Sequence, residues 1–252
     1  MLCQREADRP RWRFKLADSL CFQANVLAIT GGREAAARAL ARAHELMEAL
    51  SSHDPTNSQW KNTLVVAHLR EAMLAKAAGD RARATERLAD ARAGAEALVA
   101  AEPKDSRFPY RLATALRLEA ELQFATDGAQ ARRSLQRAME TGEKLNQRAN
   151  AKAEHRAERA HAAILAGRFA AADGDLAQAQ AEWQHAHKLL AARPDESKDW
   201  RVLDPAVRVA TLLGAVDEAQ ALRARLDACG YVPLEPWPEP TVSPRSETKV
   251  QK

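Results

Sequence analysis

Seven histidines are the side chains of this sequence best suited to metal binding or proton transfer. His155, Glu158 and His161 follow one another at three-residue steps, whereas zinc hydrolases place two histidines four residues apart with a glutamate between them. His185 and His187 are two residues apart, so a helix would point them to different faces. We therefore expect these four histidines to lie on helix surfaces and to bind no metal.

Paired carboxylates and nucleophile motifs give no sign of an active site. The pairs Glu154/Glu158 and Asp217/Glu218 are typical of charges on a helix surface. The sequence contains neither a G-x-S-x-G nucleophile elbow nor a glycine-rich phosphate-binding motif. We therefore expect no catalytic residue, no cofactor and no metal site, and a protein that is not an enzyme.

Composition and charge indicate a helical chain with no preference for nucleic acid. The 38 Lys and Arg residues nearly balance the 34 Asp and Glu residues and are interspersed with them, whereas a nucleic-acid surface usually carries a basic stripe. Cys3, Cys21 and Cys229 form neither a disulfide framework nor a zinc spacing and fit a reducing compartment. Because no apolar stretch is long enough for a membrane helix and the charged start is no secretory signal, we expect a cytoplasmic protein without a membrane partner.

The strongest pattern in the sequence is a repeat of 48 residues. The columns that recur at this step are Trp12, Trp60 and Phe108; Leu16, Leu64 and Leu112; and Ala24, Ala72 and Ala120. A fixed period in this range indicates stacked copies of one supersecondary unit, so we expect the aromatic column to lie in the core. His68 stands where the neighbouring units have Leu20 and Leu116, which predicts a partly buried histidine with a backbone or carboxylate partner.

The second unit shows the predicted helix-turn-helix organisation most clearly. Apolar residues recur at helical spacing from Trp60 onward. Gly79 suits the left-handed residue that ends a helix, and Asp80 suits the N-cap of the next one. A second helix follows and ends before Pro103.

The repeat divides the chain into a linker-like segment (1–11), a helical-repeat domain (12–231) and a tail (232–252). The predicted units are 12–53, 54–101, 102–149, 150–196 and 197–231. The tail has five prolines, few apolar residues and no period, so we expect it to be disordered. Within it, Trp237 is either a short recognition element or part of a linker.

The second helices share a motif: a small residue, a large apolar residue four positions later, and an alanine three positions after that. The motif is present as Ala36-Leu40-Ala43, Ala84-Leu88-Ala91, Ala131-Leu135-Ala138 and Ala179-Trp183-Ala186, and the fifth unit departs from it at Arg223. This pattern resembles the tetratricopeptide repeat, whose usual length is about 34 residues. The extra length adds about four helical turns, as in long-helix variants common in bacterial signalling proteins. The resemblance implies an all-α solenoid, a right-handed superhelix of about five antiparallel helix pairs, with the first helices along a concave groove.

Candidate groove residues follow from that arrangement. Phe14, Asn62 and Tyr110 stand two residues after the aromatic column, which rotates them by about 200° away from it. The other candidates are Asp18, Asn25, Met73, Thr114, Arg117 and Glu121. This mixed polar and apolar lining suits an extended or helical peptide. It lacks the Lys and Asn pattern of the family's carboxylate clamp, so we do not expect binding to chaperone C-termini.

The first unit looks like the continuation of an array. Residues 6–12 resemble the links between later units, and Trp12 and Leu16 would then face the position of an upstream helix. Exposed apolar surface of this kind usually marks an interface. We expect it to contact an upstream part of a longer polypeptide, a partner protein, or a second copy in a homo-oligomer.

The function expected from the sequence is a protein-protein interaction scaffold that binds a protein or peptide in its groove. Two alternatives remain open. The chain could be the C-terminal regulatory or sensor part of a larger bacterial signalling protein with a kinase or winged-helix domain. It could also bind RNA through its helical repeats, in which case affinity would fall steeply with salt.

Overall fold

The computed structural model describes residues 9–149, 151–191 and 199–239, and in these ranges the chain forms helices and turns without a strand. The described helices are α2 (Pro10–Ile29), α3 (Arg33–His53), α4 (Ser58–Ala77), α5 (Arg81–Ala101), α6 (Arg107–Gln123), α7 (Gly128–Asn146), α8 (Ala153–Ala172), α9 (Leu176–Leu190), α10 (Trp200–Leu212) and α11 (Val216–Asp227). The predicted all-α class is therefore confirmed for the described part of the chain.

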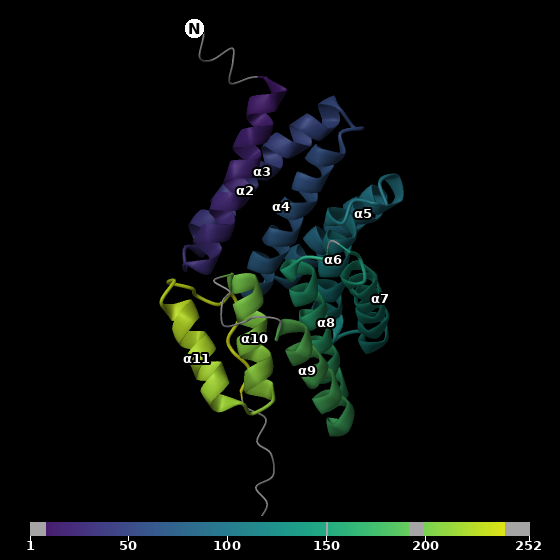
Figure 1. The fold of residues 1–252 in the computed structure, drawn as a ribbon. Helices are drawn as coiled ribbons and strands as arrows, with labels where there is room; N and C mark the ends of the chain where they lie inside the picture. Colours follow the sequence, from purple (N-terminus) through teal and green to yellow (C-terminus); the bar gives the residue numbers. More distant parts are fainter. Residues whose placement is uncertain (1–8, 150, 192–198, 240–252) are drawn as a thin grey trace, which may run out of the picture.

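The helices pack as successive pairs, one pair to each predicted unit (Figure 1). The second helix of each unit packs against the first helix of the next one, and the first helices of neighbouring units also contact one another. The result is a solenoid-like stack in which α2, α4, α6, α8 and α10 form a continuous layer. Contacts between neighbouring units are the expected basis of stability in such a stack.

Short Gly-Asp turns connect the two helices of the second and fourth units. Gly79 and Gly174 adopt φ values of 80° and 83°, a conformation that costs a glycine little. The next residue then caps the following helix, because Asp80 accepts from the backbone N–H of Arg83 at 3.0 Å and Asp175 from that of Gln178 at 2.9 Å. One dipeptide thus ends one helix and begins the next.

Small residues let the two helices of each unit approach closely. Ala36, Ala43, Ala84 and Ala91 are fully buried. Apolar side chains fill four separate clusters along the stack, each shared by neighbouring helices. The array therefore has a row of small cores rather than one central core, as expected when each unit buries its apolar face against its neighbours.

The aromatic column is core at only one of its three positions. Phe108 of α6 is fully buried in a core cluster that α6 shares with α5. Trp60 is half-buried against the core cluster of the first unit. Trp12 is 47% exposed, so the prediction that the column lies in the core is wrong there. The reason is position: Phe108 and Trp60 follow a second helix that covers them, whereas Trp12 lies on α2, which no described helix precedes. The linker predicted over 1–11 also ends earlier than expected, because Pro10 begins α2.

The array curves so that its last unit returns to the first (Figure 1). Residues 232–239, here called the C-terminal segment, run from α11 back to α2, where the backbone N–H of Val232 donates to the carbonyl of Ile29 at 2.6 Å. The expectation of a disordered tail over 232–252 is thus wrong for these eight residues, and the rest of that range lies outside the described residues. The proline content is typical of a free chain, but proline also favours an extended conformation, which side chains of the helices can bind.

Candidate functional site

The inner layer of helices encloses a cleft with a volume of about 130 Å³. All five first helices contribute to its walls, from Ile29 on α2 to Trp200 on α10. The C-terminal segment closes one side with Leu234 and Glu235. Residues more than 200 positions apart in the sequence therefore meet in one concave site, which is where a repeat scaffold usually binds its ligand.

An ion pair between Arg117 of α6 and Glu158 of α8 crosses the middle of this site. The Nε–H of Arg117 donates to Glu158 Oε1 at 2.6 Å, and Nη2 lies 3.3 Å from Oε2. Both residues are buried. Burial alone would lower the pKa of the Arg117 guanidinium, but the Glu158 carboxylate outweighs it and raises that pKa. This two-point contact holds α6 and α8 in a fixed relative position.

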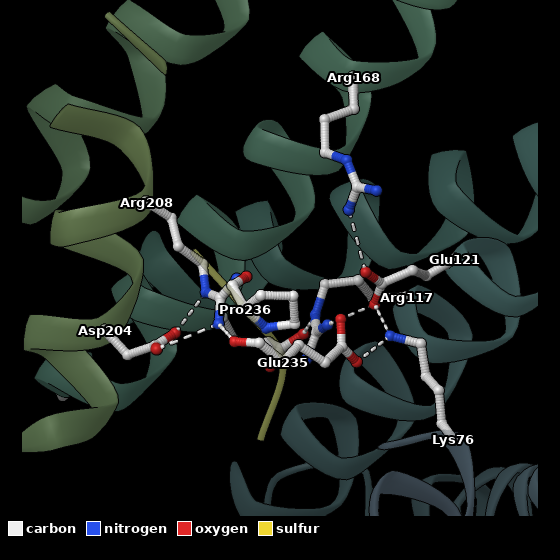
Figure 2. A network of polar contacts seen from close by, with 9 residues as sticks. Lys76, Arg117, Glu121, Arg168, Asp204, Arg208, Glu235 and Pro236 are labelled. Atoms are coloured by element: carbon white, nitrogen blue, oxygen red, sulfur yellow. Dashed lines mark hydrogen bonds and ion pairs between the residues drawn. The ribbon is translucent and has the colours of Figure 1, made fainter. Parts of the chain in front are cut away.

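Glu121 gathers three cations around one carboxylate (Figure 2). Lys76 Nζ lies 3.0 Å from one oxygen, Arg168 Nη1 lies 3.1 Å from the other, and Arg117 Nη1 is 3.9 Å away. Burial opposes ionisation, yet the charges of Lys76 and Arg117 lower the pKa of Glu121. Lys76 also forms an ion pair with Glu235 of the C-terminal segment, so the network connects helix residues to the segment.

Two arginines bind the backbone of the C-terminal segment. Arg33 Nη2 donates to the carbonyls of residues 233 and 234 at 3.2 Å and 3.1 Å. Arg208 donates to the carbonyls of residues 235 and 236 at 3.0 Å and 3.1 Å. The guanidinium of Arg208 is itself held by Asp204, with Nε 2.8 Å from Oδ2. Four successive peptide carbonyls are thus recognised without regard to their side chains.

Side chains of the C-terminal segment enter separate surroundings. Leu234 packs against the core cluster of the first unit and lines a small cavity with Asn25 and Met73. The ring of Trp237 lies 5.1 Å from the guanidinium carbon of Arg208 and 5.5 Å from that of Arg223. These distances are within cation–π range. The contact with Trp237 also explains why an arginine, Arg223, stands where the motif of the second helices has a large apolar residue.

His161 of α8 lines the same cleft and is only partly exposed. Burial lowers the pKa of its imidazole well below the ordinary value, and the positive charges of Arg117, Arg208 and Lys76 lower it further. The ring is therefore neutral at pH 7 and contributes hydrogen-bonding capacity rather than charge.

The structure gathers four of the nine predicted groove residues around the concave site: Asn25, Met73, Arg117 and Glu121. The other five are Phe14, Asp18, Asn62, Tyr110 and Thr114, which do not line either cavity in the described structure. Asp18 is exposed, Asn62 and Thr114 are buried, and Phe14 and Tyr110 are half-buried. All five lie in the N-terminal halves of their helices, or at their middle, whereas the cleft faces the C-terminal halves of α2, α4, α6 and α8.

The sequence analysis missed Arg168 and Arg208, although both stand at the same position of the repeat as three residues that it named. Asn25, Met73 and Glu121 each stand six residues before the turn that follows their helix. Arg168 and Arg208 stand six residues before Gly174 and Gly214 and also line the cleft. Continuing the column through the weaker units would have found both arginines.

Two residues predicted to be on helix surfaces are buried instead. Glu158 and His155 are 6% and 2% exposed, because α8 packs between α6 and α10 as well as against α9. The nitrogen Nδ1 of His155 accepts from the backbone N–H of Lys152 at 3.3 Å. His68 is buried, but its Nδ1 has no hydrogen-bond partner in the described structure, and the nearest carboxylate, Asp90, is 4.0 Å away.

Helix α2 carries large exposed apolar side chains. Trp12 and Leu16, the predicted end interface, are 47% and 49% exposed. Phe22 and Val26 continue the exposed surface along the same helix. Their role as an interface stays a prediction.

Across the described ranges, no helix combines the length and the apolar character that crossing a bilayer requires. Comparisons with protein-family models, curated proteins and solved structures find no match for this chain.

Proposed function

We propose that this protein is a non-enzymatic interaction scaffold of the tetratricopeptide-like type, which binds an extended peptide of a protein partner on its concave side. The repeat motif and the stacked helix pairs support this proposal. A location in the cytoplasm is part of the same proposal.

The observation that carries the proposal is the binding of the C-terminal segment. Arg33 and Arg208 hold four successive carbonyls of an extended chain, and Lys76 holds the carboxylate of Glu235. Main-chain contacts of this kind give affinity for any extended peptide, while pockets for side chains select the sequence. The segment thus marks out the geometry of a peptide site.

The contacts also suggest what a partner peptide should contain. An apolar residue would take the place of Leu234, an acidic residue that of Glu235, and an aromatic residue that of Trp237. Prolines between them would keep the peptide extended and reduce the entropy lost on binding. We therefore propose a proline-rich peptide with an apolar-acidic-x-aromatic pattern.

The C-terminal segment already occupies the proposed peptide site and competes with any added peptide. A linked segment acts at an effective concentration in the millimolar range, so a free peptide cannot readily displace it from the unaltered protein. The triple variant Leu234→Ala, Glu235→Ala, Trp237→Ala weakens the segment. It should bind a fluorescein-labelled peptide of sequence VPLEPWPE in an anisotropy titration at least about tenfold more tightly than the unaltered protein does.

Two controls complete that experiment. Adding Arg208→Ala to the triple variant should lower the peptide affinity, because two carbonyl contacts are lost, and a peptide with Lys in place of Glu should bind more weakly to the triple variant. If neither the triple variant nor the unaltered protein binds the peptide at millimolar concentration, the proposed peptide site is wrong.

An occupied site also favours a second candidate function, a regulatory or sensor module of a larger bacterial signalling protein. A partner would have to displace the segment, and that displacement could be transmitted as a signal. RNA binding has less support, because the four cations Lys76, Arg117, Arg168 and Arg208 are each paired with a carboxylate. They are therefore not available as a basic stripe for phosphates.

A further inference from the structure

Two histidines and a glutamate meet at the junction of the first and second units. His44 lies on α3, and His68 and Glu71 lie one turn apart on α4. All three are buried, and one potential metal-binding atom from each lies within 4.8 Å of the other two. His44 Nδ1 is already 3.2 Å from Glu71 Oε1, close to the separation of about 3.4 Å between ligand atoms around a tetrahedral Zn²⁺.

One buried nitrogen of this cluster, Nδ1 of His68, forms no hydrogen bond in the described structure. His68 is 7% exposed. A buried polar atom without a partner is costly and usually has a specific reason. A metal ion bound to the histidine would supply one.

The neighbouring junction shows what this position needs for packing alone. Moving 48 residues along the chain takes His44 to Arg92, His68 to Leu116 and Glu71 to Glu119. There, Arg92 Nε donates to Glu119 at 2.9 Å, and Leu116 is buried. An Arg–Glu pair beside a leucine is therefore sufficient to join two units, and two histidines are not required for it.

The surroundings of the cluster resemble those of metal sites. His44 Nε2 lies 3.1 Å from Glu48, which is the carboxylate–histidine arrangement that orients a metal-binding imidazole through its second nitrogen. Arg87 Nε lies 3.1 Å from Oε2 of Glu71 and forms an ion pair with that carboxylate. Metal binding requires neutral imidazoles. With both histidines neutral, the carboxylates of Glu48, Glu71 and Asp90 outnumber the guanidinium of Arg87, so a divalent cation would neutralise the remaining charge.

We propose that His44, His68 and Glu71 form a site for a divalent transition-metal ion, with Zn²⁺ as the best match. Imidazole and carboxylate ligands suit this ion, and a water molecule can take the fourth tetrahedral position. The bound ion joins α3 to α4 and fixes the first unit against the second.

The test is a titration of the full chain, stripped with a chelator, against Zn²⁺ in a competition assay with a fluorescent zinc indicator. We expect one equivalent to bind and the melting temperature to rise by several degrees. The double variant His44→Arg, His68→Leu copies the chemistry of the neighbouring junction, so it should keep its helical circular dichroism without metal. It should lose at least about a hundredfold in Zn²⁺ affinity, and the variant Glu48→Gln should lose about tenfold.

The variant His187→Gln serves as a matched control, since His187 also faces a glutamate, Glu218, at 3.0 Å, but the described part of the chain places no third metal-binding group beside them. It should bind Zn²⁺ like the unaltered protein. An equal affinity in the unaltered protein and in the double variant would overturn the proposal, because binding would then come from other side chains. A stoichiometry well below one equivalent for the unaltered protein would overturn it as well.

Discussion

Gly167 of α8 lies directly against the indole of Trp183 of α9. A Cβ atom added at Gly167 would come within 2.3 Å of Trp183 Nε1 and 2.5 Å of Cδ1. The indole is buried, and its N–H donates to the carbonyl of Ile164 at 3.3 Å, so it has no free space to move into. The glycine is therefore what allows a tryptophan to stand at the large apolar position of this unit.

Gly167→Ala should lower the free energy of unfolding by about 1–3 kcal/mol, since the added methyl group overpacks the junction of α8 and α9. Urea unfolding followed by tryptophan fluorescence would measure this. Gly128→Ala is the matched control, because a Cβ there meets nothing within 4 Å. A stability loss of equal size in both variants would contradict the packing argument.

Phe108 and Trp60 occupy equivalent positions but differ in burial. Phe108→Ala should cost about 3–5 kcal/mol, the range for removing a fully buried aromatic ring, because Phe108 is 0% exposed. Trp60→Ala should cost less, roughly 1–3 kcal/mol from the apolar surface that remains buried, because Trp60 is only half-buried. Chemical denaturation of both variants checks the order, and a larger loss for Trp60→Ala would show that the two positions have been ranked wrongly.

The buried pair Arg117–Glu158 should behave as a coupled unit. Glu158→Gln leaves the Arg117 guanidinium buried with one carboxylate fewer, and such a change typically costs about 3–5 kcal/mol. The double variant Arg117→Met, Glu158→Leu removes both charges and should recover much of that loss. A double-mutant cycle by urea unfolding, with Arg117→Met and Glu158→Leu as its single variants, measures the coupling. If the two single losses simply add in the double variant, the pair is not a unit.

Stability should fall as the pH drops from 7 to 5, in part because of His161. Its pKa in the folded state lies well below the ordinary value of about 6.5. In this range the unfolded chain binds a proton that the folded chain does not, so acid favours unfolding by up to about 1.4 kcal/mol per pH unit. His161→Gln should reduce this slope in thermal melts at several pH values.

His155, whose pKa is also lowered by burial, should keep part of the slope. His53→Gln, at an exposed position near the end of α3, is the control and should leave the slope unchanged. An unchanged slope in His161→Gln would mean that this histidine is not protected from protonation in the folded state.

The helix pairs could be predicted from the sequence because their signals are local. The Gly-Asp turns, the capping aspartates and the alanine-leucine-alanine motif all act within one unit. The predicted boundaries enclose the helix pairs of the second to fifth units, whereas α2 of the first unit begins two residues before the boundary at residue 12.

The site was harder to predict because its contacts join distant parts of the chain. The periodicity of α8 does not reveal that Glu158 faces Arg117, since that depends on how far the array curves. The C-terminal segment was missed for a related reason. Its prolines and charges are typical of a free chain, and the contacts that hold it come from distant residues such as Arg33, Lys76 and Arg208.

The hydrogen bond between Val232 and Ile29 has a consequence for how the molecule comes apart. An open array of repeats can fray from either end, one unit at a time. Here the segment that follows the last helix pair is hydrogen-bonded to the end of α2 in the first pair. Neither terminal pair can therefore detach without breaking this contact. Melting should then approach a single cooperative event, and refolding should be slow for a helical protein, since its final step joins residues about two hundred positions apart.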